Sequence, residues 1–312
     1  MVLLDILFKL NELSPKAGLD QNPTPSLPFQ AIHVNHGISK NAHGWAKFCM
    51  EECAKRGVPI TVEVVNVDRQ SGLGLEAAAR DARYQALMKS DAEFIFTAQH
   101  QTDQAETVLH QMLRGTGLNG LAGMGEAREL KPGQMLLRPL LKVSRDDIEK
   151  YARENKLTWI EDESNDDTTY TRNYIRREII PIIAERFPHY AVSLERIAQH
   201  AHESAELNEA LAKIDLKWDG EVAFADALDA LALPRQINAL YHWLRWQNVS
   251  PPSRDQLEAW ATQLFRAPPE GKPHLAGGHD YVIRRKRNVL TCEKKQTPRT
   301  PESGSPTTNG AK

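Results

Sequence analysis

The feature of this sequence that most constrains its fold is the alternation of two kinds of segment over its first 180 residues. Short apolar segments with the length of buried strands occupy residues 29–34, 59–67, 92–99 and 135–141. Between and after them, apolar residues recur at helical spacing in residues 41–56, 74–90, 102–115 and 144–156. Strands and helices that alternate through short loops predict an α/β domain in which helices flank a parallel sheet.

Beyond residue 180 the sequence pattern becomes mainly helical. Residues 274–295 then have the pattern of a two-stranded hairpin, and residues 296–312 are rich in Pro, Ser, Thr and Gly, as disordered segments are. We therefore expect a first domain over residues 1–180, a mainly helical second domain over residues 181–295, and a disordered tail.

Composition and charge exclude several classes of protein. No apolar run is long enough to span a bilayer and no basic signal-peptide start is present, so we expect neither membrane association nor export. The three cysteines, Cys49, Cys53 and Cys292, form no disulfide framework and fit a reducing cytoplasm. The net charge of −2 does not indicate nucleic-acid binding. The basic run at residues 284–287 is either a solvated strand end or an edge that contacts phosphate.

Polar residues that follow the predicted strands are the first candidates for a site, because parallel sheets bind ligands beyond the carboxyl ends of their strands. His33 and His36 lie at the end of the first strand, and His100 follows the third. Asp103 and Glu106 come next, three positions apart at a helix start, so they share a face. Such carboxylates suit Mg²⁺ beside a nucleotide, although the helix dipole alone also favours acids there.

Two further groups of charged residues are candidates. On the helix predicted over residues 74–90, Glu76 and Arg80 have the spacing of an i,i+4 ion pair, and an arginine of this helix could instead reach a phosphate. The stretch WIEDESNDDTTYTRNYIRR places an acidic loop before a basic helix start, which could bind a cationic group and a phosphate together or could simply cap the helix. Its candidate residues are Asp162, Asn165, Arg172, Asn173 and Arg176.

Together these stretches resemble the tRNA(Ile)-lysidine synthetases, which are members of the PP-loop ATPase superfamily. The matching pieces are AIHVNHG, GLGLEAAARDARYQAL, FIFTAQHQTDQAETVLHQMLRGTGLNGLAGM, LLRPLLKVSRDDIEKYA and WIEDESNDDTTYTRNYIRREIIPII. They occur in order over roughly residues 30–185. The resemblance implies a Rossmann-like PP-loop domain followed by a smaller helical domain that binds tRNA or substrate.

The resemblance also implies a reaction. ATP would adenylate the C2 oxygen of the wobble cytidine in tRNA(Ile) with the CAU anticodon. The amine of free L-lysine would then attack C2, giving lysidine with release of AMP and pyrophosphate. This chemistry needs Mg²⁺ to balance phosphate charge, donors for developing charge, and a pocket for one splayed base. A homodimer is one candidate assembly.

By resemblance, each candidate residue has an implied role. Asp103 and Glu106 would lie at the nucleotide, metal or lysine centre, and Arg80 or Arg83 would contact phosphate or the activated base. The residues implied to bind the cofactor ATP are His33, His36, His100 and Arg114. The residues implied to bind substrate or tRNA are Asp162, Asn165, Arg172, Asn173 and Arg176.

One part of the family pattern does not occur in this sequence. In the family, an S-G-G-x-D-S pyrophosphate loop ends the first strand directly before a helix like residues 1–13. Here that helix is apolar nearly all round, and no capping Ser, Thr, Asp or Asn precedes it. We therefore expect Met1 to be an internal methionine that a central strand and the ATP loop precede.

Two alternatives to lysine ligation are open at this point. One is a tRNA thiolation enzyme of the same superfamily, which would commonly use paired catalytic or cluster-binding cysteines. Cys49 and Cys53 lie on an apolar helix face and Cys292 is remote from them in the sequence, which counts against it. The other is a non-catalytic tRNA-binding remnant, whose binding would depend steeply on salt and would release no AMP.

Cysteine substitution separates ligation from thiolation. If lysine ligation is the reaction, Cys49→Ser, Cys53→Ser and Cys292→Ser each leave tRNA modification essentially unchanged, because no thiol takes part. The modification rate of each variant is measured with its folding checked by circular dichroism. Loss of modification in a folded variant would support the thiolation alternative.

Overall fold

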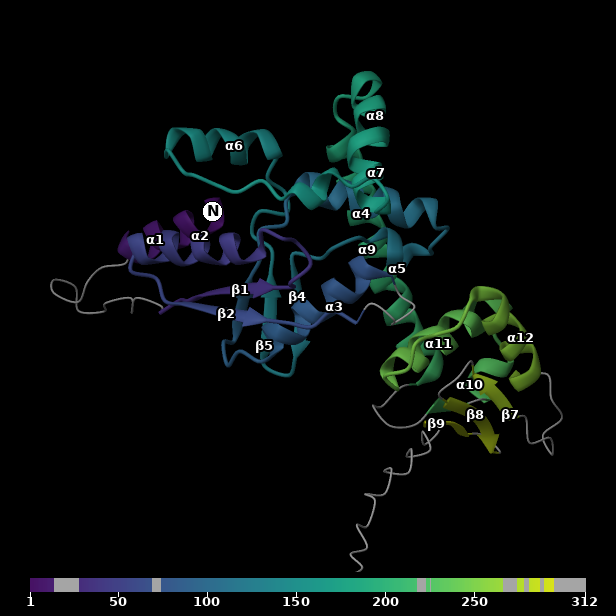
Figure 1. Cartoon of the computed structure of the whole chain (residues 1–312). Helices are drawn as coiled ribbons and strands as arrows, with labels where there is room; N and C mark the ends of the chain where they lie inside the picture. The colour runs from purple at the N-terminus through teal and green to yellow at the C-terminus, as the bar shows by residue number, and fades with distance from the viewer. Residues whose placement is uncertain are drawn as a thin grey trace, which may run out of the picture. The chain divides into compact units, whose positions relative to one another are not determined.

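The computed structural model describes residues 1–13, 28–68, 74–217, 223–224, 226–265, 274–277, 281–286 and 289–294 (Figure 1). The predicted tail at residues 296–312 lies outside this set. The chain divides into two compact units, Met1–His202 and Glu203–Lys312, and the long helix α9 (Tyr190–Leu216) passes from one into the other. Among the described residues, no helix combines the length and the apolar character needed to cross a membrane.

The first unit has the predicted alternation of strands and helices. Its strands are β1 (Ala31–Asn35), β2 (Ile60–Val64), β3 (Phe94–Phe96), β4 (Ala127–Lys131) and β5 (Gln134–Leu137). Its helices before the acidic loop are α1 (Val2–Leu13), α2 (Ala42–Lys55), α3 (Leu75–Met88), α4 (Gln101–Leu113), α5 (Leu118–Leu121) and α6 (Arg145–Glu154). After the acidic loop come a 3₁₀ turn η1 (Glu163–Asp166), α7 (Thr171–Tyr174), a π-helical turn η2 (Ile175–Ile179) and α8 (Ile180–Arg186).

The strands form parallel pairs, as predicted, with one antiparallel addition. β1 pairs with β2, and β3 pairs with β5, in parallel register. β4 pairs antiparallel with β5 through a tight turn at Gly133, whose φ of +79° is one that glycine adopts without strain. We did not predict β4, which is an antiparallel edge strand added to a parallel sheet.

Helix α3 connects the two pairs of strands through one apolar cluster. Leu87 of α3 packs with Ile95 of β3 and Leu136 of β5, all buried, and Ile32 of β1 packs against them. Burying a side chain of this kind stabilises the fold by about 1.5–3 kcal/mol. Helix α3 therefore packs against both β1 and β3.

A buried carboxylate joins α1, α2 and α6, and Figure 1 shows α1 lying along α2. Asp5 of α1 accepts a hydrogen bond from the Tyr151 hydroxyl at 3.0 Å and pairs with Lys9 at 2.9 Å and with Arg56 at 3.5 Å. Helix α6 begins as predicted, because the Ser144 hydroxyl accepts the Asp147 amide. Of these helices, α2 packs on β1 and β2.

The second unit packs helices on a small antiparallel sheet. Its further elements are β6 (Ala223–Phe224), α10 (Asp226–Asp229), α11 (Leu233–Trp246), α12 (Arg254–Phe265), β7 (His274–Gly277), β8 (Tyr281–Lys286) and β9 (Val289–Lys294). The sheet order is β6-β9-β8-β7. The predicted two-stranded hairpin at residues 274–295 was therefore wrong, because that stretch forms three strands. Trp243, Leu244 and Ile283 are among the fully buried residues of its core.

The basic run at residues 284–287 is partly structural. Arg285 donates to both oxygens of Asp229, at 3.1 and 2.9 Å, and to the carbonyl of Leu264 at 2.6 Å. Arg284 points to the other side of β8, since neighbouring strand residues alternate, and pairs with Glu293 at 3.3 Å. Arg285 therefore ties the sheet to α10 and α12, which is a structural role rather than contact with a phosphate.

Removing the largest buried side chain of the second unit tests the apolar core that its helices and sheet share. Trp243 is 1% exposed, so Trp243→Ala should destabilise the second unit by about 3–5 kcal/mol through lost burial and an unfilled cavity. Trp159, which is 48% exposed, is the control, and Trp159→Ala should change stability by less than about 1 kcal/mol. Urea denaturation followed by circular dichroism measures both. Equal effects would contradict the assigned core.

Candidate active site

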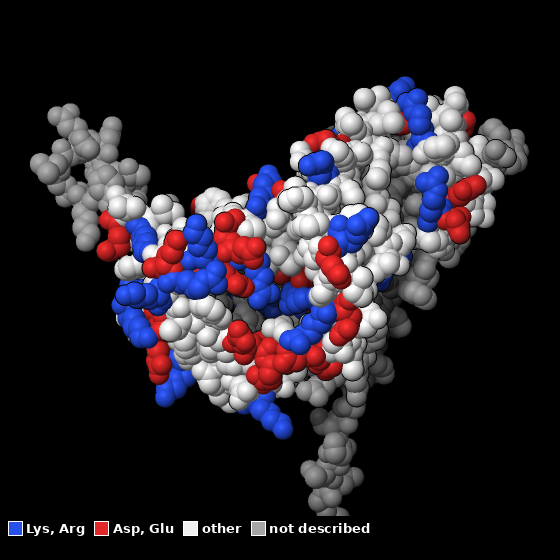
Figure 2. Space-filling view, turned by 90° about the horizontal axis from the view of Figure 1, so that it is seen from above, with Lys and Arg blue, Asp and Glu red and all other residues white. Residues whose placement is uncertain are grey.

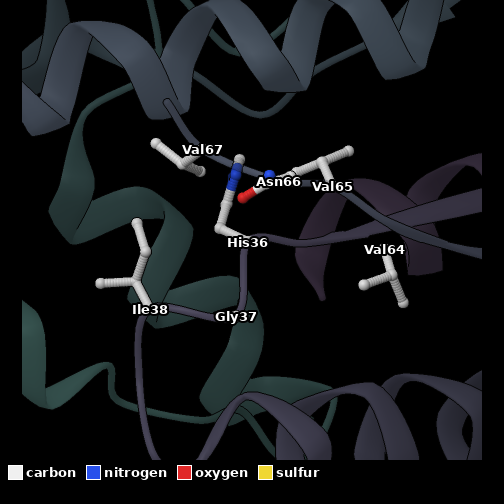
Figure 3. Close-up of a pocket in the computed structure, with 7 residues that line it drawn as sticks. All are labelled: His36, Gly37, Ile38, Val64, Val65, Asn66 and Val67. Atoms are coloured by element: carbon white, nitrogen blue, oxygen red, sulfur yellow. The ribbon is translucent and has the colours of Figure 1, made fainter. Parts of the chain in front are cut away.

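An open cavity lies beyond the carboxyl ends of β1 and β2. Its volume is about 410 Å³, and its lining residues are His36, Gly37, Ile38, Val64, Val65, Asn66 and Val67. The chain turns sharply into it at Gly37, whose φ is +63° and whose amide donates to the Asn35 side chain at 2.9 Å. Figure 3 shows the His36 ring directed toward Asn66 and Val67.

Among the described residues, five buried side-chain polar atoms have no hydrogen-bond partner, and three of them follow β1 or β3. They are Nδ1 of His36 after β1, and Oε1 of Gln99 and Nδ1 of His100 after β3. Buried polar atoms in folded proteins are nearly always bonded, so each one here calls for a polar group from water or a ligand. These three atoms lie after the carboxyl ends of strands, where a parallel sheet binds its ligand, whereas Oε1 of Gln134 lies at the start of β5 and Nε of Arg138 directly after it.

Arg83 of α3 contacts His36, one of the residues that line the cavity. Its Nε lies 3.4 Å from Nε2 of His36. Burial lowers the pKa of Arg83, and the neighbouring cations Arg80 and Arg172 lower it further. Burial also lowers the pKa of His36, as do Arg83 and His33, so the imidazole is neutral at pH 7. No carboxylate among the described residues pairs with Arg83, and a guanidinium without a carboxylate partner is suited to bind an anion.

A second group of charged residues joins α4 to the turn η2. Arg176 donates from Nε to Oε1 of Glu106 at 2.6 Å and from its terminal nitrogen to Oε2 at 2.8 Å. The same terminal nitrogen lies 3.4 Å from Asp103. Asp103 also accepts the amide of His100 at 3.0 Å, which caps α4. The hydrogen bond with Glu106 raises the pKa of Arg176, so the guanidinium stays charged.

Arg172, one helical turn before Arg176, connects three helices. It donates to the Thr107 hydroxyl at 2.9 Å and pairs with Glu76 of α3 at 3.4 Å. The i,i+4 pair of Glu76 with Arg80 that the sequence predicted is therefore wrong, since Arg80 instead lies 5.5 Å from the centre of the Tyr84 ring. Thr107 uses its proton for the carbonyl of Asp103 at 2.8 Å, so its oxygen accepts from Arg172.

The acidic loop, residues 161–167, is fixed by contacts that the sequence did not indicate. Glu163, which we did not single out, accepts from Ser39 at 2.7 Å and from Asn41 at 3.0 Å, both at the start of α2. Asn165 donates its amide to the carbonyl of Asp162 at 3.0 Å. Asn173 donates to the carbonyl of Asp167 at 2.9 Å. The loop is thus tied at both ends, to the segment after β1 and to α7.

The predicted residues fall into two groups and a remainder. His36 and Arg83 meet at the cavity, and Asp103, Glu106, Arg172 and Arg176 meet between α4 and η2. His33 is half-buried on β1, and Arg114 is exposed at the end of α4. In the part of the chain that the structure describes, no three His, Cys, Asp or Glu side chains form a metal-binding group. Figure 2 shows acidic and basic side chains gathered on the face seen from above.

The fold and the strand-end site define a PP-loop protein, and the PP-loop domain family matches residues 1–183. The family described as the TilS substrate binding domain matches residues 225–291. A tRNA(Ile)-lysidine synthase of Haemophilus influenzae is 36% identical over 94% of the chain and 67% of its own length. The chain belongs to the tRNA(Ile)-lysidine synthase family, which confirms the resemblance seen in the sequence.

Other relatives agree with this assignment. A tRNA(Ile)-lysidine synthase of Chromobacterium violaceum is 42% identical over 70% of this chain and 51% of its own length. The chain thus spans between half and two thirds of these relatives. Among solved structures, the U34-tRNA thiolase NcsA from Methanococcus maripaludis matches with a TM-score of 0.50 at 15% identity, over 65% of this chain and 68% of that one. That likeness supports the fold.

The hydroxyl of Thr107 offers a direct test of the Arg172 contact. Thr107→Val keeps the shape but removes the acceptor, so the first unit should lose about 0.5–1.5 kcal/mol of unfolding free energy. Thr262→Val in α12 is the matched control, because its hydroxyl also donates to a carbonyl four residues earlier, that of Glu258, and no arginine among the described residues donates to it. Denaturant unfolding should show a larger loss at Thr107, and equal losses would contradict the bridging role.

Proposed function

We propose that the protein is an ATP-dependent ligase that joins free L-lysine to C2 of the wobble cytidine of tRNA(Ile) with the CAU anticodon. The observation that carries the proposal is Arg83, whose guanidinium contacts His36 at an open cavity beyond the strand ends and pairs with no carboxylate among the described residues. Family membership supports the same conclusion.

ATP fits this cavity by its chemistry. The apolar side chains of Val65 and Val67 suit a base or ribose, and the unpartnered Nδ1 of His36 suits a polar atom of the nucleotide. Arg83 would hold a phosphate oxygen and stabilise charge as the pyrophosphate leaves. We also propose that ATP contacts His33, His100 and Arg114. For His100 this is supported by its Nδ1 atom, which is buried and has no hydrogen-bond partner among the described residues.

Mg²⁺ would be held by Asp103 together with phosphate oxygens and water. Asp103 is 26% exposed, its Oδ2 accepts the His100 amide and its Oδ1 lies 3.4 Å from Arg176, and the partial exposure is what supports access by a cation. Mg²⁺ is commonly bound through one or two carboxylates plus substrate phosphates, which fits a single partly exposed acid. When bound, the ion supplies positive charge to the phosphates.

The proposed reaction has two steps, adenylation of the cytidine and transfer of lysine. The C2 oxygen of cytidine attacks the α-phosphorus and pyrophosphate leaves. The lysine amine then forms the C–N bond at C2, the C–O bond breaks, AMP departs with the oxygen, and the amine loses a proton.

Five residues would contact the substrate or the tRNA. Two are arginines that are each about one third exposed, Arg172 and Arg176, and the others are Asp162, Asn165 and Asn173. A single base splayed from the anticodon loop would be bound, as is usual for sequence-specific RNA recognition.

Thiolation is the weaker candidate. Cys53 is 2% exposed, and burial raises the pKa of both Cys49 and Cys53, so these thiols are poor nucleophiles at neutral pH. Cys292 lies in β9 of the second unit.

The function is tested with the protein expressed from its own gene. We expect radiolabelled lysine to enter a tRNA(Ile) transcript with the CAU anticodon, with one AMP released per lysine, when ATP and Mg²⁺ are present. A tRNA(Met) transcript, which has the same anticodon, is the specificity control. Salt-sensitive tRNA binding with no lysine incorporation and no AMP would support the tRNA-binding remnant instead.

Arg83 should matter to the rate of this reaction. Arg83→Ala should lower kcat/KM by about 100-fold, as expected when one donor to developing charge is removed. Arg128→Ala is the matched control, because Arg128 is an exposed arginine of β4 that lies over the Tyr84 ring at 4.8 Å, next to Arg80. Similar losses in both variants would contradict a specific role for Arg83.

A further inference from the structure

Glu106 and Asp103 stand on the same face of α4, but their surroundings differ. The Glu106 side chain is 2% exposed, whereas that of Asp103 is 26% exposed. Both oxygens of Glu106 accept from Arg176, at 2.6 and 2.8 Å, in the paired geometry that makes arginine–carboxylate bonds strong. Of the two acids, Glu106 is the one that Arg176 separates from solvent.

This arrangement does not suit direct binding of a cation by Glu106. Mg²⁺ takes six oxygen ligands in a nearly octahedral shell and usually keeps several waters. A buried carboxylate whose two oxygens already bond a guanidinium offers little room for that shell. A lysine ammonium would likewise have to displace Arg176, which would leave two cations competing for one acid.

The backbone of Arg176 has π-helical geometry. Arg176 lies in the π-helical turn η2, and such widened turns, which occur mostly as single turns within α-helices, are frequent at functional sites. Directly before it, Ile175 is 1% exposed and packs with Leu109 of α4 and Ile180 of α8, so the backbone is anchored to α4. The long side chain of Arg176 would still have many rotamers, and the bonds to Glu106 select one of them.

In that rotamer one edge of the guanidinium stays available. Nε and one terminal nitrogen bond Glu106, and that terminal nitrogen also faces Asp103. Within residues 74–217 and the other described ranges, no group bonds the remaining nitrogen, Nη1. The side chain of Arg176 is 32% exposed. The guanidinium therefore has an inner edge bonded to Glu106 and an outer edge that can reach a substrate.

We propose that Glu106 is a positioning residue, which orients Arg176 toward the substrate and binds neither metal nor lysine itself. The inference rests on the proposed ligase function and assigns the two acids different tasks. Asp103 stays accessible for a cation, and Glu106 acts only through Arg176. Substitution of Glu106 should therefore lower kcat without changing the Mg²⁺ requirement, whereas substitution of Asp103 should change the Mg²⁺ requirement.

A double-mutant cycle tests the proposal, with Glu106→Gln, Arg176→Lys and the double variant. Glutamine keeps the size of the acid but not its charge, and lysine keeps the charge but not the paired bonds. We expect each single variant to lower kcat for lysine incorporation by about 10- to 100-fold, with KM changed less. The double variant should be no slower than the slower single variant, because both substitutions remove the same interaction.

Two matched measurements accompany the cycle. Glu149→Gln is the control, because Glu149 of α6 is also bonded to an arginine, Arg145 at 2.8 Å, but is 37% exposed. The activity of this variant should equal that of the unmodified protein. The Mg²⁺ concentration that gives half of the maximal rate should be the same for Glu106→Gln and the unmodified protein. Thermal unfolding of every variant shows that the chain is folded at the assay temperature.

Other outcomes would overturn the proposal. If the losses of the two single variants multiply in the double variant, or if Glu106→Gln needs about tenfold more Mg²⁺ or lysine, Glu106 binds a ligand directly. If the unmodified protein incorporates no lysine, the proposed function fails. The same cycle is then measured as the dissociation constant for the tRNA, where loss in each single variant without further loss in the double variant still supports positioning.

Discussion

The ion pair between Glu106 and Arg176 joins two helical segments that lie 70 residues apart in the sequence. A carboxylate that is 2% exposed would be costly to desolvate without a partner, by several kcal/mol, and a paired guanidinium compensates it. Beneath the pair, Leu109 and Ile175 pack in one apolar cluster. Because the apolar contact fixes the helices and the ion pair fixes the side chains, the arginines of α7 and η2 have defined positions at the site.

The sheet contributes the second half of the site through its direction. In each parallel pair the carboxyl ends lie at one edge, so the segments after β1 and β2 lie together, and the segment after β3 lies beside the end of β5. Helix α3 packs on both pairs of strands and places Arg83 against His36. Arg172 connects the two halves, since it contacts Glu76 of α3 and Thr107 of α4. Helix α3, which carries Arg83, and helix α4, which carries the two acids, are therefore connected through one arginine.

Errors in the sequence-based predictions have a common cause. The strand β4 was missed because residues 127–131 alternate weakly, and it forms by pairing with β5 rather than by burying an apolar face. The extra strand of the second unit was missed for the same reason. Glu76 was assigned to Arg80, its neighbour on the helix, whereas folding supplies Arg172 as its partner. In each case a contact distant in sequence outweighed a local pattern.

The sequence by itself determined the alternation of strands and helices, the family, and the set of candidate side chains, because strand and helix periodicity and the order of motifs are local properties of the chain. Only the tertiary structure decided which of those side chains meet. It bonded Arg176 to Glu106, left Arg83 without a carboxylate among the described residues, and made Glu163 a tie to the start of α2. Such pairings depend on how helices pack in three dimensions, and spacing along the chain does not encode that packing in any local pattern.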